Sequence, residues 1–268
     1  CKISHASSKV DPGSYELRSS FDYRALIKNM QSGSGATLTT TVTIPEGFSM
    51  HQTFLRLEEE GVCSYNELMD AAANATFNYS FIDPDELGNA YRLEGFLFPD
   101  TYEFYVGMQA SSAINKMLEN FYYKQTEEML QRAEELGLSM RDVVNIASLI
   151  EKEAANDEER PIIASVIYNR LAAGTPLGID ASILYLYPDH EGGPTAEMLA
   201  QDSPYNTRMY AGLPPTPISN PGIASINAAL YPISSDYFYY ALDTETGTHR
   251  FFNNSAEFDA FVATQNYG

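Results

Sequence analysis

Hydrophobic residues recur at helical spacing along most of the second half of the chain. Between residues 111 and 136, Ile114, Leu118 and Phe121 fall on one face, which predicts a single long amphipathic helix. Ser139 then caps the next helix, which runs to a polar break. The break is at residues 156–160, and further helices are predicted over 161–173, from 182, and over 195–201, 223–230 and 256–265.

Three segments of this half do not follow the helical pattern. Residues 237–242 are predicted to form a buried strand, and residues 248–252 are predicted to pair with it. Residues 203–222 contain five prolines, which exclude regular structure. A segment of this length in a compact domain is usually functional or disordered. Because Tyr205 and Ile218 offer apolar anchors, we expect an ordered loop that lines a groove.

The first hundred residues mix strand and helix patterns. The patterns predict a polar tail at 1–13, a short strand at 14–17, a helix at 21–30, a loop at 31–36, a strand at 37–44 and helices at 50–60 and 65–73. Ser64 and Glu67 have the spacing of a capping box. Residues 92–105 alternate apolar and polar positions around Pro99, which predicts a strand that enters and leaves a turn.

These elements predict an α+β protein with two lobes. The first lobe covers residues 1–105, and the second, residues 106–268, is mainly helical with a small β-sheet. A sheet through residues 92–105 is expected to be shared by the lobes. The strand–helix–helix unit at about 37–91, which contains Ile-Pro-Glu-Gly, resembles a LysM-like module. Such modules bind glycans that contain N-acetylglucosamine, so the resemblance implies a sugar-binding unit, and a structural spacer is the alternative.

A Glu-Lys-Glu sequence lies at the end of the helix that Ser139 caps. Ala147, Glu151 and Ala154 share one face, so Glu151 should flank a buried surface. Loss of water raises the pKa of a carboxylic acid, and an acid that is protonated near neutral pH can serve in catalysis. Glu153 lies about 200° further around the helix and could reach Arg160. Alternatively, both glutamates are ordinary solvated helix residues.

The composition of the chain excludes several classes of binding partner. The 268-residue chain has 36 acidic and 16 basic side chains and a net charge of −20. This balance argues against nucleic acid as a partner, because phosphate binding needs clustered Lys and Arg, and it disfavours unassisted docking to an anionic membrane. The two cysteines and four histidines lack metal-ligand spacing, so we predict no metal and no cofactor. No run of eighteen apolar residues is present, and a chain that begins with Cys leaves an N-terminal anchor open.

Six segments together are similar to those of one enzyme family. They are LEGFLFPDTYEF (93–104), ASLIEKEA (147–154), ASVIYNRL (164–171), SPYNT (203–207), GLPPTPISNPG (212–222) and YFYYAL (237–242). In their order and spacing they resemble the endolytic murein transglycosylase, or YceG-like, family. The resemblance implies cleavage of peptidoglycan glycan strands between N-acetylmuramic acid and N-acetylglucosamine. No water is added, because the C6 hydroxyl of muramic acid attacks its own anomeric carbon and leaves a 1,6-anhydro end.

The resemblance also implies roles for individual residues. The catalytic glutamate of the family corresponds to Glu151, which would protonate the leaving oxygen and then accept the proton of the C6 hydroxyl. Glu153 would orient the loop or the sugar. The other implied substrate-binding residues, for which a role in loop architecture is the alternative, are Asp180, Tyr205, Asn206, Thr207 and Asn220.

Two departures from the family pattern concern the groove. The family commonly has a glutamine and a proline beside the aspartate that matches Asp180, where this chain has Gly178 or Ile179 and Ala181. Its closing region usually ends in Glu-His, where this chain has Glu257 followed by a phenylalanine.

Two other functions are compatible with the sequence. One is a glycan-binding or scaffold protein with an inert second lobe. The other is a hydrolytic muramidase that uses Glu151 with Asp180 or Glu94, although Glu94 can also be a satisfied structural glutamate. The resemblance further implies a single N-terminal membrane anchor outside this chain. It places the protein in the bacterial cell envelope, on the extracytoplasmic face of the cytoplasmic membrane, beside penicillin-binding proteins.

Overall fold

The computed structural model describes residues 21–31 and 38–267. The predicted tail at 1–13, the strand at 14–17 and nearly all of the loop at 31–36 lie outside the described residues.

The chain divides into two compact units, residues 1–123 and 124–268. Each unit contains helices and one antiparallel pair of strands, which confirms the α+β class. The sequence predicts this boundary near residue 105. The helix that follows residue 105 packs on the aromatic core of the first unit and is counted with it.

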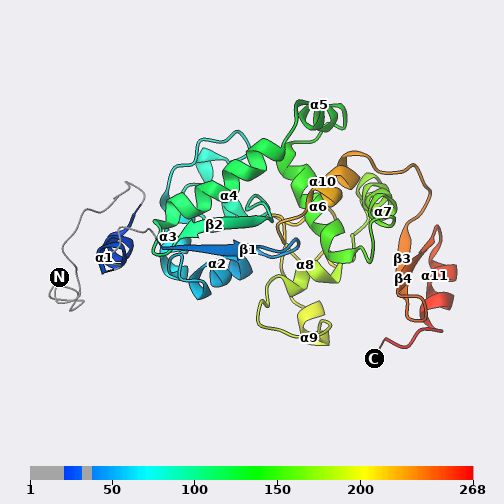
Figure 1. Ribbon diagram of the computed structural model, residues 1–268. Helices are drawn as coiled ribbons and strands as arrows, with labels where there is room; N and C mark the ends of the chain where they lie inside the picture. Colours follow the sequence, from blue (N-terminus) through cyan, green and yellow to red (C-terminus); the bar gives the residue numbers. More distant parts are fainter. Residues whose placement is uncertain (1–20, 32–37, 268) are drawn as a thin grey trace. The chain divides into compact units, whose positions relative to one another are not determined.

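The first unit is coloured blue to green in Figure 1. It begins with a short helix, and two further helices follow in the sequence between two strands that pair with each other. Its elements are α1 (Tyr23–Gln31), β1 (Thr39–Thr43), α2 (Met50–Glu59), α3 (Tyr65–Asn74), two 3₁₀ turns (Pro84–Glu86 and Ala90–Leu93), β2 (Thr101–Tyr105) and α4 (Ala110–Lys124). The predicted strand–helix–helix order is confirmed, as is the capping box of Ser64 and Glu67. Glycan binding by this unit stays a prediction.

The sheet of the first unit is formed by two strands of the same unit. β1 and β2 are antiparallel, with Thr41 opposite Glu103. In the described part of the chain, the strands of the second unit pair only with each other, so the prediction of a sheet shared by the lobes is wrong. Pro99 lacks an N–H for strand pairing, and the chain before Thr101 is irregular, which limits β2 to five residues.

Aromatic packing explains why α4 belongs to the first unit. The ring of Phe121 on α4 meets Phe81 edge-on at 4.8 Å and Phe96 at 5.3 Å. Phe81 in turn stacks on Phe96 at 5.0 Å. All three rings are buried, and such pairs add to the stabilisation from burial alone.

The prediction of one helix over 111–136 is wrong, because α4 and α5 (Glu127–Glu135) are separate helices. The side chain of Thr126 accepts a hydrogen bond from the backbone N–H of Met129 and so caps α5. As an N-cap, Thr126 has an extended backbone, with φ −86° and ψ 158°, which interrupts the helical path. The apolar spacing continues across the break to Ala133, which is why periodicity did not reveal it.

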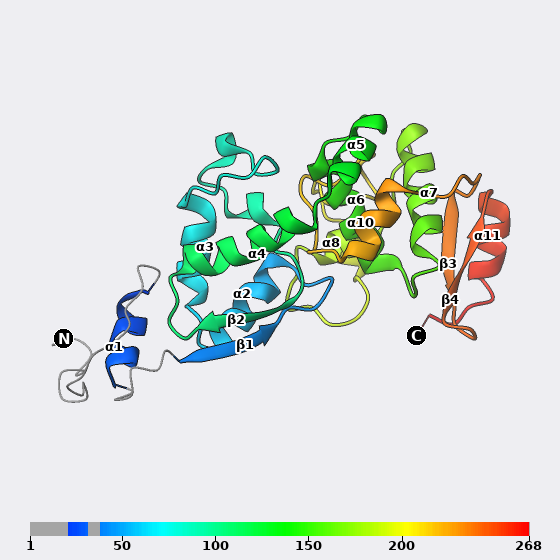
Figure 2. The same ribbon diagram turned by 45° about the horizontal axis from the view of Figure 1, so that its top comes forward.

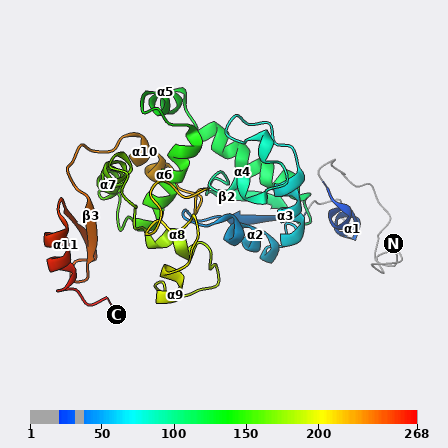
Figure 3. The same ribbon diagram turned by 180° about the vertical axis from the view of Figure 1, so that it is seen from behind.

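The second unit is a group of helices followed by a β-hairpin and a last helix. Its elements after α5 are α6 (Met140–Glu153), α7 (Arg160–Ala172), α8 (Asp180–Leu184), α9 (Ala196–Leu199), α10 (Ile223–Leu230), β3 (Tyr239–Asp243), β4 (Thr248–Phe252) and α11 (Ser255–Val262). Figures 1, 2 and 3 show the hairpin between α7 and α11. No helix in the described part of the chain is long and apolar enough to cross a membrane.

Helix α6 is the centre of the second unit. Ser139 and Asp142 form a capping box at its start, as the spacing predicts. Nine of its fourteen residues are buried, because both α7 and α10 pack against it. Its last turn, which carries Glu151 and Glu153, reaches the edge of this core. The core thereby holds both glutamates on a rigid element.

The two faces of the hairpin have different neighbours. On one face, Tyr239 stacks on Phe258 of α11 at 5.3 Å. On the other, Tyr240 and His249 pack edge-on, with their ring centroids 5.4 Å apart. β3 was predicted to be a buried strand, but most of its side chains are only half-buried, so that prediction is wrong. The reason is that Tyr239, Tyr240, Ala241 and Leu242 line a cavity instead of a packed core.

Candidate active site

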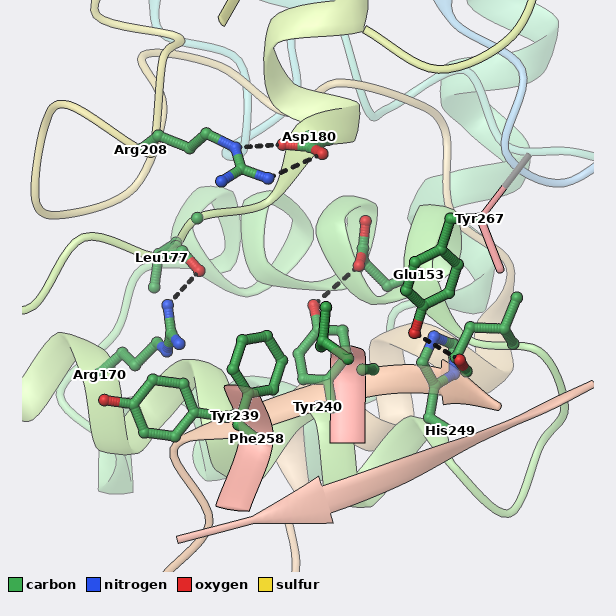
Figure 4. Close-up of a pocket in the computed structure, with 14 residues that line it drawn as sticks. Glu153, Arg170, Leu177, Asp180, Arg208, Tyr239, Tyr240, His249, Phe258 and Tyr267 are labelled. Atoms are coloured by element: carbon green, nitrogen blue, oxygen red, sulfur yellow. Dashed lines mark hydrogen bonds and ion pairs between the residues drawn. The ribbon is translucent and has the colours of Figure 1, made fainter. Parts of the chain in front are cut away.

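A cavity of about 610 Å³ lies in the second unit (Figure 4). Its walls come from the end of α6, the segment that leads into α8, the β3–β4 hairpin and α11. Five ionisable side chains other than tyrosines line it, namely Glu153, Arg170, Asp180, Arg208 and His249. The α6 core and the hairpin thus bring together residues that are far apart in the sequence.

Glu153 is the last residue of α6 and faces Tyr240 across the cavity wall (Figure 4). The hydroxyl of Tyr240 donates a hydrogen bond of 2.8 Å to Oε2 of Glu153. Burial raises the pKa of Glu153, and it outweighs the opposing effects of the Tyr240 hydrogen bond and the nearby His249. Burial, reinforced by the Glu153 carboxylate, also raises the pKa of Tyr240, so its phenol remains a neutral donor. The pair therefore favours a protonated carboxylic acid at the cavity.

His249 is held at the cavity by Glu159, which lies just before α7. Nδ1 of His249 is 2.8 Å from Oε2 of Glu159, and its backbone N–H donates to Oε1 at 2.7 Å. The N–H of Ala155 also donates to this carboxylate, at 3.2 Å. Burial works to raise the pKa of Glu159, but these hydrogen bonds together lower it below its ordinary value. Glu159 is thus a buried carboxylate that stays ionised.

Asp180 and Arg208 form an ion pair on another wall of the cavity (Figure 4). Nε and Nη2 of Arg208 contact the two carboxylate oxygens of Asp180, at 2.5 and 2.9 Å. Such a fork arrangement fixes the direction of both side chains. Arg170 instead donates to the backbone carbonyls of Phe238 and Leu177, and so ties the hairpin to the segment before α8.

Glu151, two residues before Glu153, has different neighbours and does not line the cavity. Its side chain is 7% exposed and forms an ion pair of 3.3 Å with Arg160. It also accepts a hydrogen bond of 3.0 Å from the backbone N–H of Gly222, at the start of α10. Together these contacts fix the position of the carboxylate.

Glu151 completes a polar stripe along one side of α6, at a spacing of three residues. Asn145 donates to the carbonyl of Pro214 at 2.8 Å, and the hydroxyl of Ser148 accepts from the N–H of Ile218 at 3.0 Å. With Glu151 on Gly222, the stripe binds the backbone of the proline-rich loop at three points. The loop, predicted to be ordered, is therefore fastened to the central helix.

Comparison with known proteins places the chain in a family. The model of the YceG-like family matches residues 1–264. The chain belongs to this family. A crystal structure of a yceG-like protein from Listeria monocytogenes superposes on it with a TM-score of 0.73 and 31% sequence identity, covering 97% of this chain and 87% of that one.

Two curated proteins that are similar to this chain carry the name endolytic murein transglycosylase. The protein of Bacillus subtilis (strain 168) is 32% identical over 250 residues, which cover 87% of this chain and 67% of the relative. The protein of Streptococcus pneumoniae (serotype 2, strain D39) is 30% identical over 275 residues. That alignment covers 94% of this chain but only 50% of the relative, so the chain spans half the length of the pneumococcal protein.

Four of the predicted substrate-binding residues lie inside the loop structure of this family member. Asn206 is buried, and its amide donates to the carbonyls of Leu199 and Gln201. The Thr207 hydroxyl is buried against the backbone of Ile179. The other two are Tyr205, whose hydroxyl contacts that of Thr216, and Asn220, which is fully buried. None of the four lines the cavity, so their binding role stays a prediction.

Glu153 and Asp180 are the two predicted site residues that the cavity brings together. Thr207 supports Asp180 indirectly. Its carbonyl and hydroxyl accept hydrogen bonds from the N–H groups of Gly178 and Ile179 and so hold the chain that enters α8. Glu94 belongs to the first unit, where its carboxylate accepts from the N–H of Met50 at 2.9 Å. That contact shows a structural role for Glu94 at the start of α2.

Sequence reasoning missed Tyr240, Glu159 and Arg208 as members of the site. Tyr240 lies in a tyrosine-rich strand, where alternation alone could have separated it from Tyr239. Glu159 stood in a polar break with four other charged or polar residues and had no distinguishing signal. In the described part of the chain, no group of three or more His, Cys, Asp or Glu side chains could hold a metal ion.

Proposed function

We propose that this chain is a peptidoglycan lytic transglycosylase that cuts within glycan strands, with Glu153 as its acid. Membership of the YceG-like family and relatives named endolytic murein transglycosylase support the activity. The observation that carries the choice of Glu153 is its position. It lines the cavity with a raised pKa, whereas Glu151 is bound to Arg160 and to the backbone of Gly222.

The geometry of Glu153 suits proton donation to a leaving oxygen. Tyr240 occupies Oε2, and Oε1 has no hydrogen-bond partner among the described residues. In the protonated acid, Tyr240 therefore holds the carbonyl oxygen and leaves the O–H on Oε1 to the substrate. Its raised pKa keeps the acid protonated to higher pH than an ordinary glutamate, and general acid–base catalysis supplies about 10²–10⁴-fold.

The lytic reaction needs no bound water. The C6 hydroxyl of muramic acid attacks C1 of the same sugar while the C1–O4 bond to glucosamine breaks. Because both reacting groups belong to one sugar ring, the attack benefits from a high effective molarity. A single carboxylate can serve both proton transfers, since Glu153 becomes a carboxylate once it has protonated the leaving oxygen.

A hydrolytic muramidase would need a second carboxylate beside Glu153. Asp180 lines the same cavity, but both of its oxygens are engaged by Arg208. Glu94 is engaged by the backbone of Met50. Neither candidate is an unpaired carboxylate, and the products of the reaction separate hydrolysis from lytic cleavage.

The wider setting follows from the family resemblance and is part of this proposal. It includes a membrane anchor that precedes this chain and a position on the extracytoplasmic face of the bacterial cytoplasmic membrane. It also includes penicillin-binding proteins as neighbours. The net charge of −20 agrees with a substrate bound through hydroxyl and amide groups rather than through phosphates.

Mass spectrometry of peptidoglycan strands incubated with the chain tests the proposal. The wild type is expected to release 1,6-anhydro-muramic ends, and Glu153→Gln is expected to release them about 10²–10⁴-fold more slowly. Glu151→Gln serves as the matched control in the same motif and is expected to retain activity. Products heavier by one water would identify a hydrolase, and no products from the wild type would favour a binding module. Loss of products with Glu151→Gln alone would return the acid role to Glu151.

A further inference from the structure

The cavity contains a second group that can accept a proton, and this group is the imidazole of His249. Its Nδ1 is bound to Glu159 at 2.8 Å. Its Nε2 has no hydrogen-bond partner among the described residues and is not among the buried atoms without one. Because His249 lines the cavity and its side chain is still 11% exposed, Nε2 is the atom that faces the open space.

Glu159 determines which nitrogen carries the proton. Its carboxylate is ionised and accepts hydrogen bonds only, so Nδ1 must be the N–H nitrogen in the neutral ring. Nε2 is then a bare acceptor. A carboxylate that orients a histidine in this way fixes its tautomer and stabilises the imidazolium that forms when Nε2 takes up a proton.

Tyr240 connects this dyad to Glu153. Its hydroxyl donates to Glu153, and its ring meets the His249 ring edge-on at an interplanar angle of 87°. Both contacts come from one face of the hairpin, opposite the face that packs on α11. An acid and a base therefore border the same cavity, and one rigid aromatic side chain touches both.

We propose that His249 is the general base of the reaction and that Glu159 is its positioning residue. This inference rests on the proposed lytic function and divides the two proton transfers between two groups. The proton of the C6 hydroxyl passes to Nε2 as the O6–C1 bond forms. The C1–O4 bond breaks and its electron pair stays on O4, which takes the proton of Glu153. Proton exchange with solvent then restores neutral His249 and protonated Glu153, and no other reactant is consumed.

The variant His249→Asn tests the base directly. The asparagine amide can still donate to Glu159 from about the position of Nδ1, but it presents no atom in place of Nε2. We expect kcat to fall by about 10²-fold or more, with KM nearly unchanged. His190→Asn, at a half-exposed histidine outside the cavity, is the matched control. A His249→Asn enzyme with near wild-type kcat would overturn the proposal and leave Glu153 as the only catalytic group.

The variant Glu159→Gln tests the positioning role without changing the size of the side chain. A glutamine amide can donate to Nδ1, which moves the ring proton to Nε2 and turns the acceptor into a donor. We expect the ¹⁵N signals of His249 to report the exchanged tautomer and kcat to fall while the fold is retained. An unchanged tautomer, or an exchanged tautomer with unchanged kcat, would contradict the role of Glu159.

Glu158→Gln, an exposed neighbour, controls for the loss of one charge in this segment. Glu153→Gln, assayed in parallel, separates the two levels of the argument. Anhydro products that depend on Glu153 but not on His249 would refute the base and keep the proposed function. No products from the wild type would refute the proposed function and the base with it.

Discussion

The last turn of α6 sends two glutamates into two different regions. Glu151 forms an ion pair with Arg160 and accepts a hydrogen bond from the backbone N–H of Gly222. Glu153 enters the cavity, where its hydrogen-bond partner is the uncharged phenol of Tyr240 and burial raises its pKa. The two residues share a helix, a motif and a chemical group, yet only Glu153 lines the cavity.

The difference shows that the neighbours of a carboxylate decide its task. A cation and a backbone donor both bind the Glu151 carboxylate, which suits a structural link between α6, α7 and the start of α10. Burial beside a neutral donor favours the protonated form, which suits an acid. Under the proposed function, the Glu-Lys-Glu motif therefore combines one structural residue, Glu151, with one catalytic residue, Glu153.

The largest effect should come from removing the acid. Glu153→Gln keeps the size of the side chain and its contact with Tyr240 but has no proton to donate. We expect the rate of strand cleavage to fall by about 10²–10⁴-fold, as measured by release of anhydro ends over time. Glu151→Gln should lose far less, because a glutamine oxygen can still accept from Gly222. Equal losses in the two variants would mean that the two regions do not differ in function.

The second-largest effect should be a loss of stability when Glu151 is replaced. Glu151→Ala leaves the guanidinium of Arg160, which is 13% exposed, without one of its carboxylate partners and leaves the Gly222 N–H without its acceptor. We expect the free energy of unfolding to fall by about 3 kcal/mol, the lower end for breaking a buried ion pair. Urea denaturation measures the change.

Two control variants accompany that measurement. Glu158→Ala, at an exposed position, should change the free energy of unfolding by about 0.5 kcal/mol or less. Combining Glu151→Ala with Arg160→Met removes both members of the pair, and a loss smaller than the sum of the single losses would confirm their coupling. Additive losses would show that the ion pair contributes nothing of its own.

Local signals in the sequence predicted much of the framework. The capping box of Ser139 and Asp142 predicted the start of α6, and α10 has the predicted bounds of residues 223–230. Capping also shows where periodicity fails. Thr126 starts a new helix inside an apolar repeat that continues on both sides of it. Signals that act within about four residues, such as helix caps and apolar spacing, were therefore reliable. The exception is Thr126, where a cap and a continuing apolar repeat competed.

The site depended on contacts that no local signal carries. The sequence correctly indicated that Glu151 and Glu153 point in different directions, but not which direction leads to a cavity. Tyr240 and Glu153 are 87 residues apart, and Gly222 and Glu151 are 71 apart. The polar stripe of Asn145, Ser148 and Glu151 was nevertheless visible as an interruption of an apolar helix, and a proline-rich loop needs backbone partners of this kind.

A third prediction tests the hydrogen bond at the cavity. Tyr240 favours the charged form of Glu153 and so lowers a pKa that burial has raised. Tyr240→Phe removes this opposition, so the pKa of Glu153 should rise further. Because the acid must be protonated, the alkaline limb of the kcat/KM profile should move to higher pH, with a lower maximum rate. Tyr123→Phe, at an exposed tyrosine that does not line the cavity, is the control, and an alkaline limb that moves to lower pH would contradict the assignment.

The smallest effect concerns stability against pH and again separates the two regions. Glu153 has an ordinary value of 4.5 and a higher pKa in the folded chain, so folding takes up a proton between these values. Its contribution to stability is complete below pH 4.5 and is lost as the pH rises through the raised pKa. Glu153→Gln lacks this loss, so its Tm relative to wild type should increase from pH 4.5 up to the raised pKa and then level off. Glu159, whose pKa is lowered, should behave in the opposite sense: Glu159→Gln should be least stable relative to wild type above pH 4.5 and approach it as the pH falls. Thermal melts of both variants over one pH series would therefore diverge, and parallel curves would show that the two carboxylates share one environment.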